Sequence, residues 1–544
     1  MLRITKTLHL GRCGILAILA LLLAAPSALG ASAAAGGQGH DISLAWSLPF
    51  VLLLVAIALM PFIHKHWWEK NYPWVAVGLG LVVAVYYWFV APSAGHWLDE
   101  MKEYVSFIAL LGSLYVISGG IAIRVNRRAT ASANTALLLI GALVANVFGT
   151  TGASMLLIRP YLRMNRGHLK PFHIVFFIFI ISNCGGSLTP IGDPPLFLGY
   201  LKGIPFWWTV EHLWPIWAVT VGALLAVFFV IDLWDHRRQE RPHTDEAGPQ
   251  VHILGIQNFI FICVVIFAVF QDGFFEALQM ARRHGLTAGA LAKVLFCREA
   301  LMLGAAVAAK SLTGRVVYQA NDFTYGPIRE VAILFLGIFS TMVPALQWLN
   351  HNASKVGVHT PGQFYFAAGG LSSVLDNAPT YLTFLQTRLG ELEEPKKHSG
   401  DVDKAEIDLA ISELQRMLEA GTTEIRPGLP PNVRLALLEY VADHGEQFRR
   451  NLPVTPETRE QMKLAFLTGV PMQNAFIVAI SAGAVLFGAM TYIGNGPNFM
   501  VKSIAESAGA RTPSFLGYLL RYALPILLPL YVLVWLLFFA GWHL

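Results

Sequence analysis

Residues 182–195 read SNCGGSLTPIGDPP and lie inside an apolar segment that runs from about 171 to 201. Proline lacks a backbone N–H and clashes with the preceding helical turn, so this stretch cannot form a continuous helix. A helix that breaks inside a membrane frees backbone carbonyls, which can bind cations, and exposes a half-helix N-terminus, which can bind anions. The stretch therefore predicts a binding site within a membrane span; a structural kink capped by polar side chains is the alternative.

The composition identifies the class of protein. Of 544 residues, 55% are apolar and only 13% are charged, whereas soluble domains carry about 25% charged residues. The 34 phenylalanines and 14 tryptophans are the opposite of a disordered composition. The four cysteines show no CxxC spacing, which argues against a disulfide framework or a cysteine metal site. The composition predicts a polytopic membrane protein.

Apolar stretches long enough to cross about 30 Å of hydrocarbon recur along the chain. They lie near residues 44–62, 73–91, 104–123, 171–201, 213–234, 253–271, 287–309, 330–349, 465–500 and 523–540. The stretch 287–309 is the weakest, because Arg298 and Glu299 lie inside it. Two further apolar segments, 134–158 and 363–386, have centres rich in helix breakers.

Residues 1–30 have the pattern of a secretory signal peptide. Basic residues precede a short apolar run from Gly14 to Ala25, and small residues follow it. An uncleaved first helix is the alternative. In both cases we expect the chain near His40 to lie outside the cytoplasmic membrane, with a bacterial inner membrane as the natural setting.

Basic residues in the short loops predict the orientation, because cytoplasmic loops hold an excess of Lys and Arg. With both mature termini outside, eighteen basic residues fall in cytoplasmic loops and five in outer loops. Segment 134–158 has basic clusters on both flanks, at 124–128 and 159–163, so both flanks are expected to be cytoplasmic. The segment is therefore predicted to be a re-entrant hairpin with its tip near 148–154, protected by surrounding protein or a water-lined cavity.

The sequence contains an internal repeat. TPIGDPPLF at 189–197 and TYIGNGPNF at 491–499 share five of nine residues, at an offset of 302. Upstream, the matched pairs are Ser154 with Thr380 and Glu103 with Glu330, at offsets of 226 and 227. The offset grows between the hairpin and the broken span, so the second copy is expected to contain an insertion. We place this charged extramembrane insertion at 388–463, with helical periodicity at 406–418 and 433–440.

These observations predict the fold class: an all-α polytopic membrane protein with two repeats, at 44–235 and 253–541. Each repeat has five spans, one of them broken, and a re-entrant hairpin. Because five crossings leave the chain on the opposite side, the second repeat must be inverted. Inverted repeats with broken helices are the architecture of secondary transporters; a channel or receptor with chance similarity is the alternative.

Two carboxylates lie in the predicted membrane segments, and a carboxylate at that depth by default marks an ion or proton path. Asp193 follows the first break, and Asp376 lies at the tip of the second hairpin. Asp193 has an alternative role as a cap of the half-helix after the break. No Lys or Arg occurs in either hairpin core or near the breaks, which favours cations or protons over anions. The sequence contains neither HExxH nor GxxxxGK[ST], so neither a zinc protease nor direct coupling to ATP is supported.

The stretch GGSLTPIGDPP at 185–195 resembles the signature of the ion transporter superfamily, which includes NhaD-type sodium/proton antiporters, arsenite exporters and citrate–metal symporters. LDNAPT at 375–380 resembles the hairpin motif of the same group. The resemblance implies two inverted repeats, opposed hairpins, elevator-like movement and a homodimer. The insertion is atypical of the group.

The resemblance also assigns candidate substrate- and ion-binding residues. These are Thr150, Thr151, Ser154, Asn183, Thr189, Asp193, Asp376, Asn377, Thr380, Thr491, Asn495 and Asn498. Asp193 and Asp376 are the candidate ligands of a transported sodium ion.

The sequence thus predicts a cation-coupled secondary transporter, without enzymatic activity or a resident cofactor, and most simply a sodium/proton antiporter. In that hypothesis Asp376 carries the proton and sodium displaces it. A citrate-like carboxylate symporter is the alternative within transport. An intramembrane aspartyl protease is the alternative of another class, but it leaves the repeat unexplained. The expected partners are a small ion or carboxylate and the lipid bilayer, with no nucleic acid.

Overall fold

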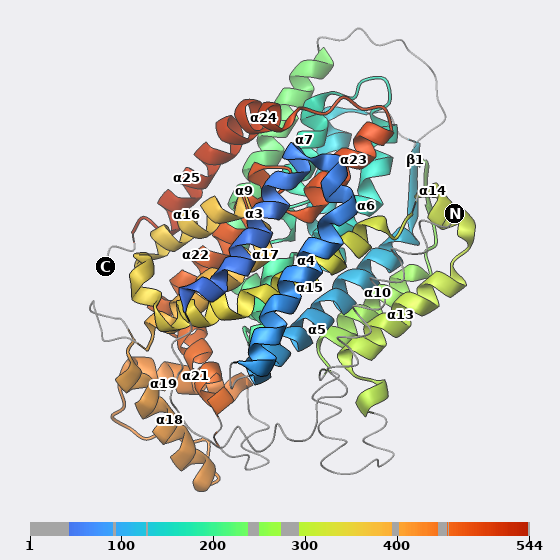
Figure 1. Ribbon diagram of the computed structural model, residues 1–544. Coiled ribbons are helices and arrows are strands. Elements are labelled where there is room, and N and C mark those ends of the chain that lie inside the picture. The colour runs from blue at the N-terminus through green and yellow to red at the C-terminus, as the bar shows by residue number, and fades with distance from the viewer. Residues whose placement is uncertain are drawn as a thin grey trace. The chain divides into compact units, whose positions relative to one another are not determined.

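The computed structural model describes residues 43–90, 94–126, 129–237, 250–271, 273, 293–321, 323–393, 402–443, 454 and 456–541. Within these residues, eight helices are long and apolar enough to cross a membrane, which confirms an all-α polytopic membrane protein (Figure 1). The predicted signal peptide at 1–30 lies outside the described residues. The chain forms two compact units, which are described in turn.

The first unit comprises residues 1–110, 271–300 and 324–351. Its helices are η1 (Leu44–Ser47), α3 (Leu48–Ile63), α4 (Lys65–Phe89), the first part of α5 (Ala94–Gly119) and α15 (Gly326–His351). Helices α15 and α4 pack closely because Gly337 lies against the backbone of Ala76. Phe107 stacks on Phe335 with ring centroids 4.9 Å apart. None of the predicted site residues belongs to this unit.

The second unit comprises residues 111–270, 301–323 and 352–544 and holds all the predicted site residues. Its first half contains β1 (Ala122–Asn126), α6 (Ala131–Met164), α7 (Pro171–Ile180), η2 (Cys184–Gly186), α8 (Pro194–Lys202), α9 (Phe206–Arg237), β2 (Gln250–Leu254) and α10 (Asn258–Val269). Helix α13 (Arg298–Leu312) belongs to this unit from Leu301 onward. Elements α14 (Arg315–Ala320) and η3 (Ala353–Val356) follow it in the chain. The remaining elements are α16 (Pro361–Ser372), α17 (Asn377–Glu391), α18 (Lys404–Glu419), α19 (Pro431–Asp443), α21 (Pro456–Gly469), α22 (Pro471–Phe487), η4 (Gly488–Met490), α23 (Gly496–Ser507), α24 (Phe515–Tyr518), η5 (Leu519–Leu527) and α25 (Leu528–Phe538).

Element α6 is a hairpin of two helices. In a straight helix, Asn134 and Asn165 would lie about 46 Å apart at the usual rise per residue. Instead, their side-chain amides exchange two hydrogen bonds of 2.9 Å. The chain reverses at Gly149, whose φ of 72° and ψ of 157° are not helical and suit a residue without a Cβ atom. The chain therefore doubles back as predicted for 134–158.

A second hairpin consists of α16 and α17. Thr360 begins α16 with a capping box, in which its hydroxyl accepts from the Gln363 backbone N–H and the Gln363 side chain accepts in return. The two ends of the hairpin meet where the His359 ring contacts the Glu391 carboxylate, 3.2 Å apart. Both hairpins therefore have their bases closed by polar side chains. The tip of the first hairpin is buried, whereas Leu371 and Val374 at the tip of the second are exposed.

Each hairpin is accompanied by a broken segment. The first runs through α7, η2, an irregular stretch and α8; the second runs through α22, η4, an irregular stretch and α23. In each break two glycines approach so closely that a Cβ atom would collide with a carbonyl: Gly192 with Gly186, and Gly494 with Gly488. This contact explains why small residues are needed at both breaks.

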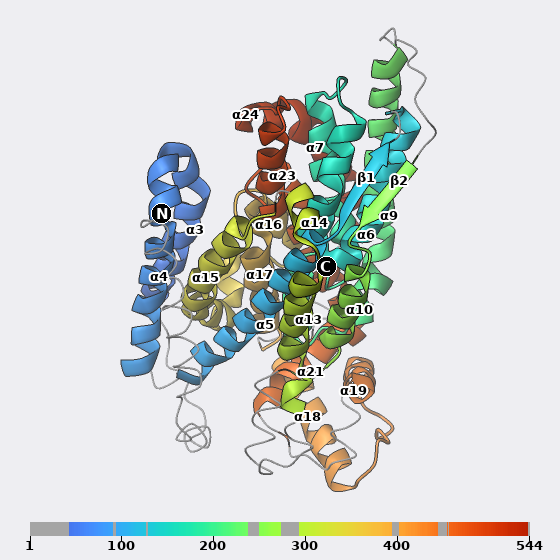
Figure 2. The same ribbon diagram turned by 90° about the vertical axis from the view of Figure 1, so that its right-hand side faces the viewer.

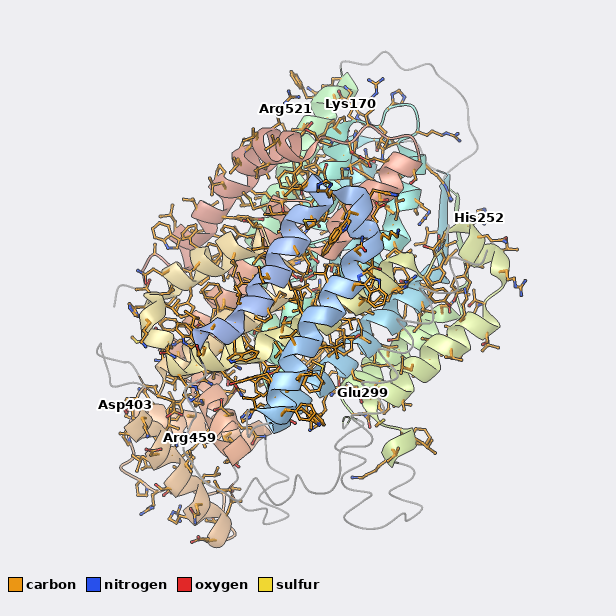
Figure 3. The ribbon with its side chains drawn as sticks, viewed as in Figure 1. Lys170, His252, Glu299, Asp403, Arg459 and Arg521 are labelled. Atoms are coloured by element: carbon orange, nitrogen blue, oxygen red, sulfur yellow. The ribbon has the colours of Figure 1, made fainter. Side chains whose placement is uncertain are left out.

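The helices predicted at 406–418 and 433–440 are present as α18 and α19, beside α21 at one end of the unit (Figure 1). Figure 3 places Asp403 and Arg459 at this end, whereas Lys170 and Arg521 lie at the opposite end. The charge count places both Lys170 and Arg521 on the cytoplasmic side, although Arg521 lies within η5. The arrangement supports an insertion on the outer side, whose boundaries at 388–463 stay a prediction.

The structure also differs from the sequence prediction by including two strands. Strands β1 and β2 form an antiparallel ribbon in which Ala122 is opposite Leu254 and Asn126 is opposite Gln250 (Figure 2). Their charged and polar residues had indicated loops at the ends of spans. The ribbon adds a small sheet to an otherwise helical unit.

Three predicted spans have different limits. In the 287–309 region the described helix is α13, which has 15 residues and begins at Arg298. Glu299 lies in its first turn, where an acidic side chain favours a helix start. Residues 287–292 lie outside the described residues. In the 253–271 region, α10 has 12 residues. The last span starts at Phe515 rather than near 523, because the Ser514 hydroxyl caps its first turn.

Candidate functional site

Asp193 lies at the centre of the candidate site. Its side chain is 1% exposed. One carboxylate oxygen accepts hydrogen bonds from the Thr150 hydroxyl, at 2.9 Å, and from the Asn495 amide, at 3.0 Å. The other accepts from the Asn377 amide at 2.5 Å. One side chain thereby joins both hairpins and both breaks, and four predicted site residues are brought together.

The two carboxylates have different roles in the helices. The Asp376 carboxylate accepts from the backbone N–H of Ala378 at 3.1 Å and so caps α17. Asp193 is the residue before α8, but its side chain makes no capping hydrogen bond. The capping role considered for Asp193 is therefore wrong, and that role belongs to Asp376. The geometry makes Asp193 the stronger candidate for the ion-binding carboxylate.

Asn146 was missed by the sequence analysis, although it holds the first break in place. Its amide donates to the Gly185 carbonyl at 2.7 Å, and its side-chain oxygen accepts from the Leu188 N–H at 2.9 Å. Thr189, which was predicted, donates its hydroxyl to the Asn146 carbonyl at 2.6 Å. The sequence did contain a signal for this role, because Asn146 lies one helical turn before Thr150 and Thr151. A side-chain amide in an apolar helix needs a hydrogen-bond partner.

The second break repeats this contact. The Thr491 hydroxyl donates to the Ser373 carbonyl at 2.6 Å. Thr491 follows Thr189 by 302 residues, and Ser373 follows Asn146 by 227. These are the offsets of the sequence repeat, so equivalent threonines tie equivalent breaks to equivalent hairpins. This pair of contacts supports the predicted repeat, and the inversion of its second copy stays a prediction.

Asn183 and Asn498 connect the two breaks directly. The Asn183 amide donates to the Asn498 side-chain oxygen at 2.6 Å, and both side chains are fully buried. The positions equivalent to these two residues are Val485 and Leu196, which pack together in a buried apolar cluster. One side of the junction is thus polar and the other apolar, which makes the two halves of the site chemically different.

Two buried amide oxygens in the site, those of Asn183 and Asn377, have no hydrogen-bond partner. Buried acceptors are normally satisfied by protein, water or an ion. Neutral amide and carboxylate oxygens are the ligands that hard cations such as sodium prefer. Among the described residues there is no cluster of three or more His, Cys, Asp or Glu side chains that could hold a transition metal.

The other predicted residues lie nearby but make local contacts. Ser154 exchanges a hydrogen bond of 2.8 Å with Ser182. The Thr380 hydroxyl donates to the Asp376 carbonyl, one helical turn earlier, at 3.1 Å. Thr151 is half-buried beside Thr150. The hydrogen bonds of Ser154 and Thr380 are therefore made within or beside the hairpins and not to Asp193.

Comparison with known proteins identifies the family. A family model described as "Putative citrate transport" matches residues 39–539, nearly the whole chain. The chain belongs to this citrate-transport family. No curated protein matches the sequence. The match agrees with the resemblance to the ion transporter superfamily, and the protein is a multi-pass membrane transporter of a small solute, not an enzyme.

In this member of the citrate-transport family, the half-helices after the two breaks differ in their hydrogen-bonding groups. Helix α8 begins with Pro194 and Pro195, which have no N–H to donate. Helix α23 begins with Gly496, which keeps its N–H and is exposed between buried neighbours. A Cβ atom at Gly496 would meet nothing within 4 Å. Only the second break therefore presents an accessible first N–H at a helix N-terminus.

Proposed function

We propose that this transporter moves a small carboxylate of the citrate class, coupled to a sodium ion or a proton held at Asp193. The observation that carries the proposal is the chemical difference between the breaks. The first has a carboxylate and two prolines, whereas the second has an amide, an exposed glycine and open space. The first break suits a cation and the second an anion.

The cation is expected between the first break and the tip of the second hairpin. Asp193 supplies the negative charge, and the side-chain oxygen of Asn377 is a buried acceptor without a partner. Thr150 and Asn495 satisfy one Asp193 oxygen and orient it. Because Asp193 contacts elements from both parts of the repeat, binding a cation there would stabilise the arrangement of the two hairpins.

The carboxylate is expected at the start of α23. A helix N-terminus binds anions through free backbone N–H groups and the helix dipole, and Gly496 leaves room for a ligand to approach. Asn495 lies between the two positions and donates to Asp193. The cation would thus neutralise the carboxylate of Asp193 before an anion approaches, which gives a physical reason for coupled transport.

Sodium/proton antiport is the second candidate function. It is favoured by the absence of Lys and Arg from 183–200, from 465–500 and from the hairpin cores, since many anion sites include such a cation. In this mechanism Asp193 would exchange a proton for sodium, and no anion would be carried.

Proteoliposomes that contain a pH-sensitive dye distinguish the two functions. We expect labelled citrate to accumulate when a sodium or proton gradient points inward, and sodium alone to move few protons. Proton movement driven by sodium without citrate uptake would establish antiport instead. Empty liposomes and the Asp193→Asn variant serve as controls.

A further inference from the structure

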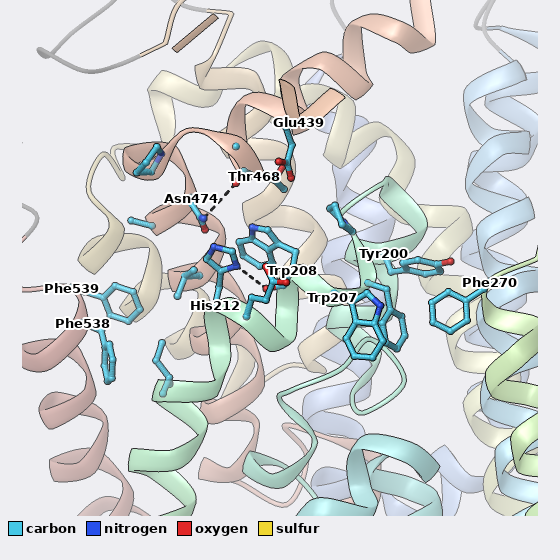
Figure 4. A pocket seen from close by; sticks show the side chains of 18 residues that line it. Tyr200, Trp207, Trp208, His212, Phe270, Glu439, Thr468, Asn474, Phe538 and Phe539 are labelled. Carbon is cyan, nitrogen blue, oxygen red and sulfur yellow. Dashed lines mark hydrogen bonds between the residues drawn. The ribbon is translucent and has the colours of Figure 1, made fainter. Parts of the chain in front are cut away.

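A pocket of about 1030 Å³ lies away from Asp193, at the end of the second unit where α9 and α22 begin (Figure 4). Helix α19 of the insertion and the end of α25 complete its wall. Ligand pockets have volumes of about 300–1,000 Å³, so the space is large enough for a lipid headgroup or a small organic molecule.

Hydrogen-bond acceptors dominate the polar lining of the pocket. Glu211 and Glu439 contribute carboxylates, and the lining includes no Lys or Arg. The side-chain oxygen of Asn474 is buried and has no partner. His212 directs Nδ1 to the Trp208 carbonyl at 2.8 Å; in the tautomer that donates from Nδ1, Nε2 is an acceptor. A ligand for this lining must bring several N–H donors.

Trp208 provides a donor at the same place. Its side chain is 4% exposed, and its indole Nε1 is buried without a hydrogen-bond partner. Figure 4 shows Trp208 beside His212, on which it stacks with ring centroids 4.7 Å apart. A buried indole N–H normally has an acceptor, so the ligand is expected to carry an oxygen near its donor group.

Aromatic side chains surround these polar groups, and two of them are exposed. Trp207 is 61% exposed and Phe270 is 48% exposed, and both line the pocket. Aromatic faces attract cations. Tryptophans at the end of a span typically lie at the level of lipid headgroups, and Trp207 occupies that place at the start of α9.

We propose that this pocket binds the primary ammonium group of a phosphate-bearing amine, such as the headgroup of phosphatidylethanolamine. The ammonium group would donate to the carboxylates and to Asn474, and Trp208 Nε1 would donate to a phosphate oxygen. A choline headgroup lacks the N–H donors, and a glycerol headgroup lacks the ammonium. The same chemistry is available in soluble phosphoethanolamine, so the source of the amine is decided by experiment.

Native mass spectrometry of the purified full chain can test this assignment with three lipids of identical acyl chains. We expect phosphatidylethanolamine to be retained over phosphatidylcholine and phosphatidylglycerol by roughly five- to tenfold. Glu211→Gln is an exposed change and should abolish most of this preference. Trp208→Phe should instead weaken retention of all three lipids, because each of them carries the phosphate to which the indole N–H would donate. Glu419→Gln on α18 and Trp214→Phe on α9 are matched controls that should keep both the preference and the retention, since neither residue lines the pocket.

Equal retention of the three lipids, together with no thermal stabilisation by soluble phosphoethanolamine, would overturn the proposal. A lipid preference that survives Glu211→Gln, together with retention of all three lipids that is unchanged by Trp208→Phe, would also overturn it, because the site would then lie elsewhere. Stabilisation by phosphoethanolamine that Glu211→Gln removes, without any lipid preference, would assign the pocket to a soluble amine.

Discussion

The Asn495 side chain donates a hydrogen bond of 3.0 Å to the carboxylate of Asp193, although 302 residues separate them. These two residues occupy the same position of the repeated motif. When two copies are related by a twofold axis, a residue can contact its own equivalent only close to that axis. The contact between Asn495 and Asp193 therefore indicates where the twofold axis of the inverted repeat would pass. The Asp193 carboxylate would lie close to this axis.

Replacing Asp193 by asparagine should abolish coupled transport. The Asp193 carboxylate accepts from three donors. An asparagine at this position would have one side-chain oxygen, and its NH2 group would face a donor of a neighbouring side chain. We expect a loss of stability of about 1–3 kcal/mol as well as of sodium dependence, measured by thermal unfolding and by uptake. Asp376→Asn is the matched control: asparagine caps helices well, so transport should continue at a reduced rate. If Asp376→Asn alone lost coupling, the role of titrating ligand would return to Asp376.

Replacing Gly496 by proline tests the proposed anion site. The change removes the N–H at the start of α23, adds a ring at the same place, and gives Asn-Pro-Pro where the first break has Asp-Pro-Pro. Proline is compatible with the first position of a helix, and Asn495 already has the extended conformation that precedes proline, with φ of −153° and ψ of 138°. Citrate KM should rise by roughly tenfold, as loss of one charge-assisted hydrogen bond implies. Gly496→Ala keeps the N–H and should keep KM; an unchanged KM in both variants would argue against an anion at α23.

Two glycines should respond oppositely to alanine. A Cβ atom at Gly483 would lie 2.4 Å from the Tyr365 carbonyl of the facing hairpin, so Gly483→Ala should destabilise the protein by about 1–3 kcal/mol. Gly222 lies in α9 with nothing within 4 Å of the added atom. Gly222→Ala should therefore be neutral or stabilise by up to about 1 kcal/mol. Melting temperatures of both variants in one detergent provide the comparison, and a stable Gly483→Ala protein would contradict the close packing of α16 on α22.

The insertion should lose stability in acid. The hydrogen bond from Arg416 lowers the pKa of Glu413 from 4.5 to about 2; burial opposes this, and the Arg426 N–H and side chain add to it. Because the folded-state pKa is depressed, the stabilisation is present above pH 4.5 and is lost as the pH falls toward 2. Hydrogen exchange of α18 in the full chain should be faster for Glu413→Gln than for wild type at pH 7, and similar near pH 2. Glu419→Gln, at an exposed position, should match wild type throughout.

The orientation can be tested with single cysteines at exposed, described positions. In a background without the native cysteines, Glu419→Cys on the insertion should react with an impermeant maleimide added to intact cells. His252→Cys on the strand ribbon should react only after the cells are opened, because its loop is cytoplasmic by the charge count. The reverse pattern of labelling would contradict the predicted topology.

Much of the second unit could be predicted from local pattern. Basic clusters on both flanks indicated the first hairpin, and the Asn134–Asn165 contact agrees with it. Prolines and glycines indicated both breaks. The division of roles between Asp193 and Asp376 could not be predicted, because it depends on hydrogen bonds between segments hundreds of residues apart. Asn146 was missed because only one of its partners, the Ala142 carbonyl, lies on its own helix. The other two, Gly185 and Leu188, lie in the break.

The ribbon of β1 and β2 has a consequence for the chain between them. Paired strands share one water phase, so the 123 residues that separate Asn126 from Gln250 leave that phase and come back to it. A chain that starts and ends on the same side of a membrane must cross it an even number of times. The segment formed by α7 and α8 accounts for one passage and α9 for the second, which leaves none for α6. Backbone pairing thus gives the same answer for the first hairpin as the distribution of charge, although the two depend on separate physics.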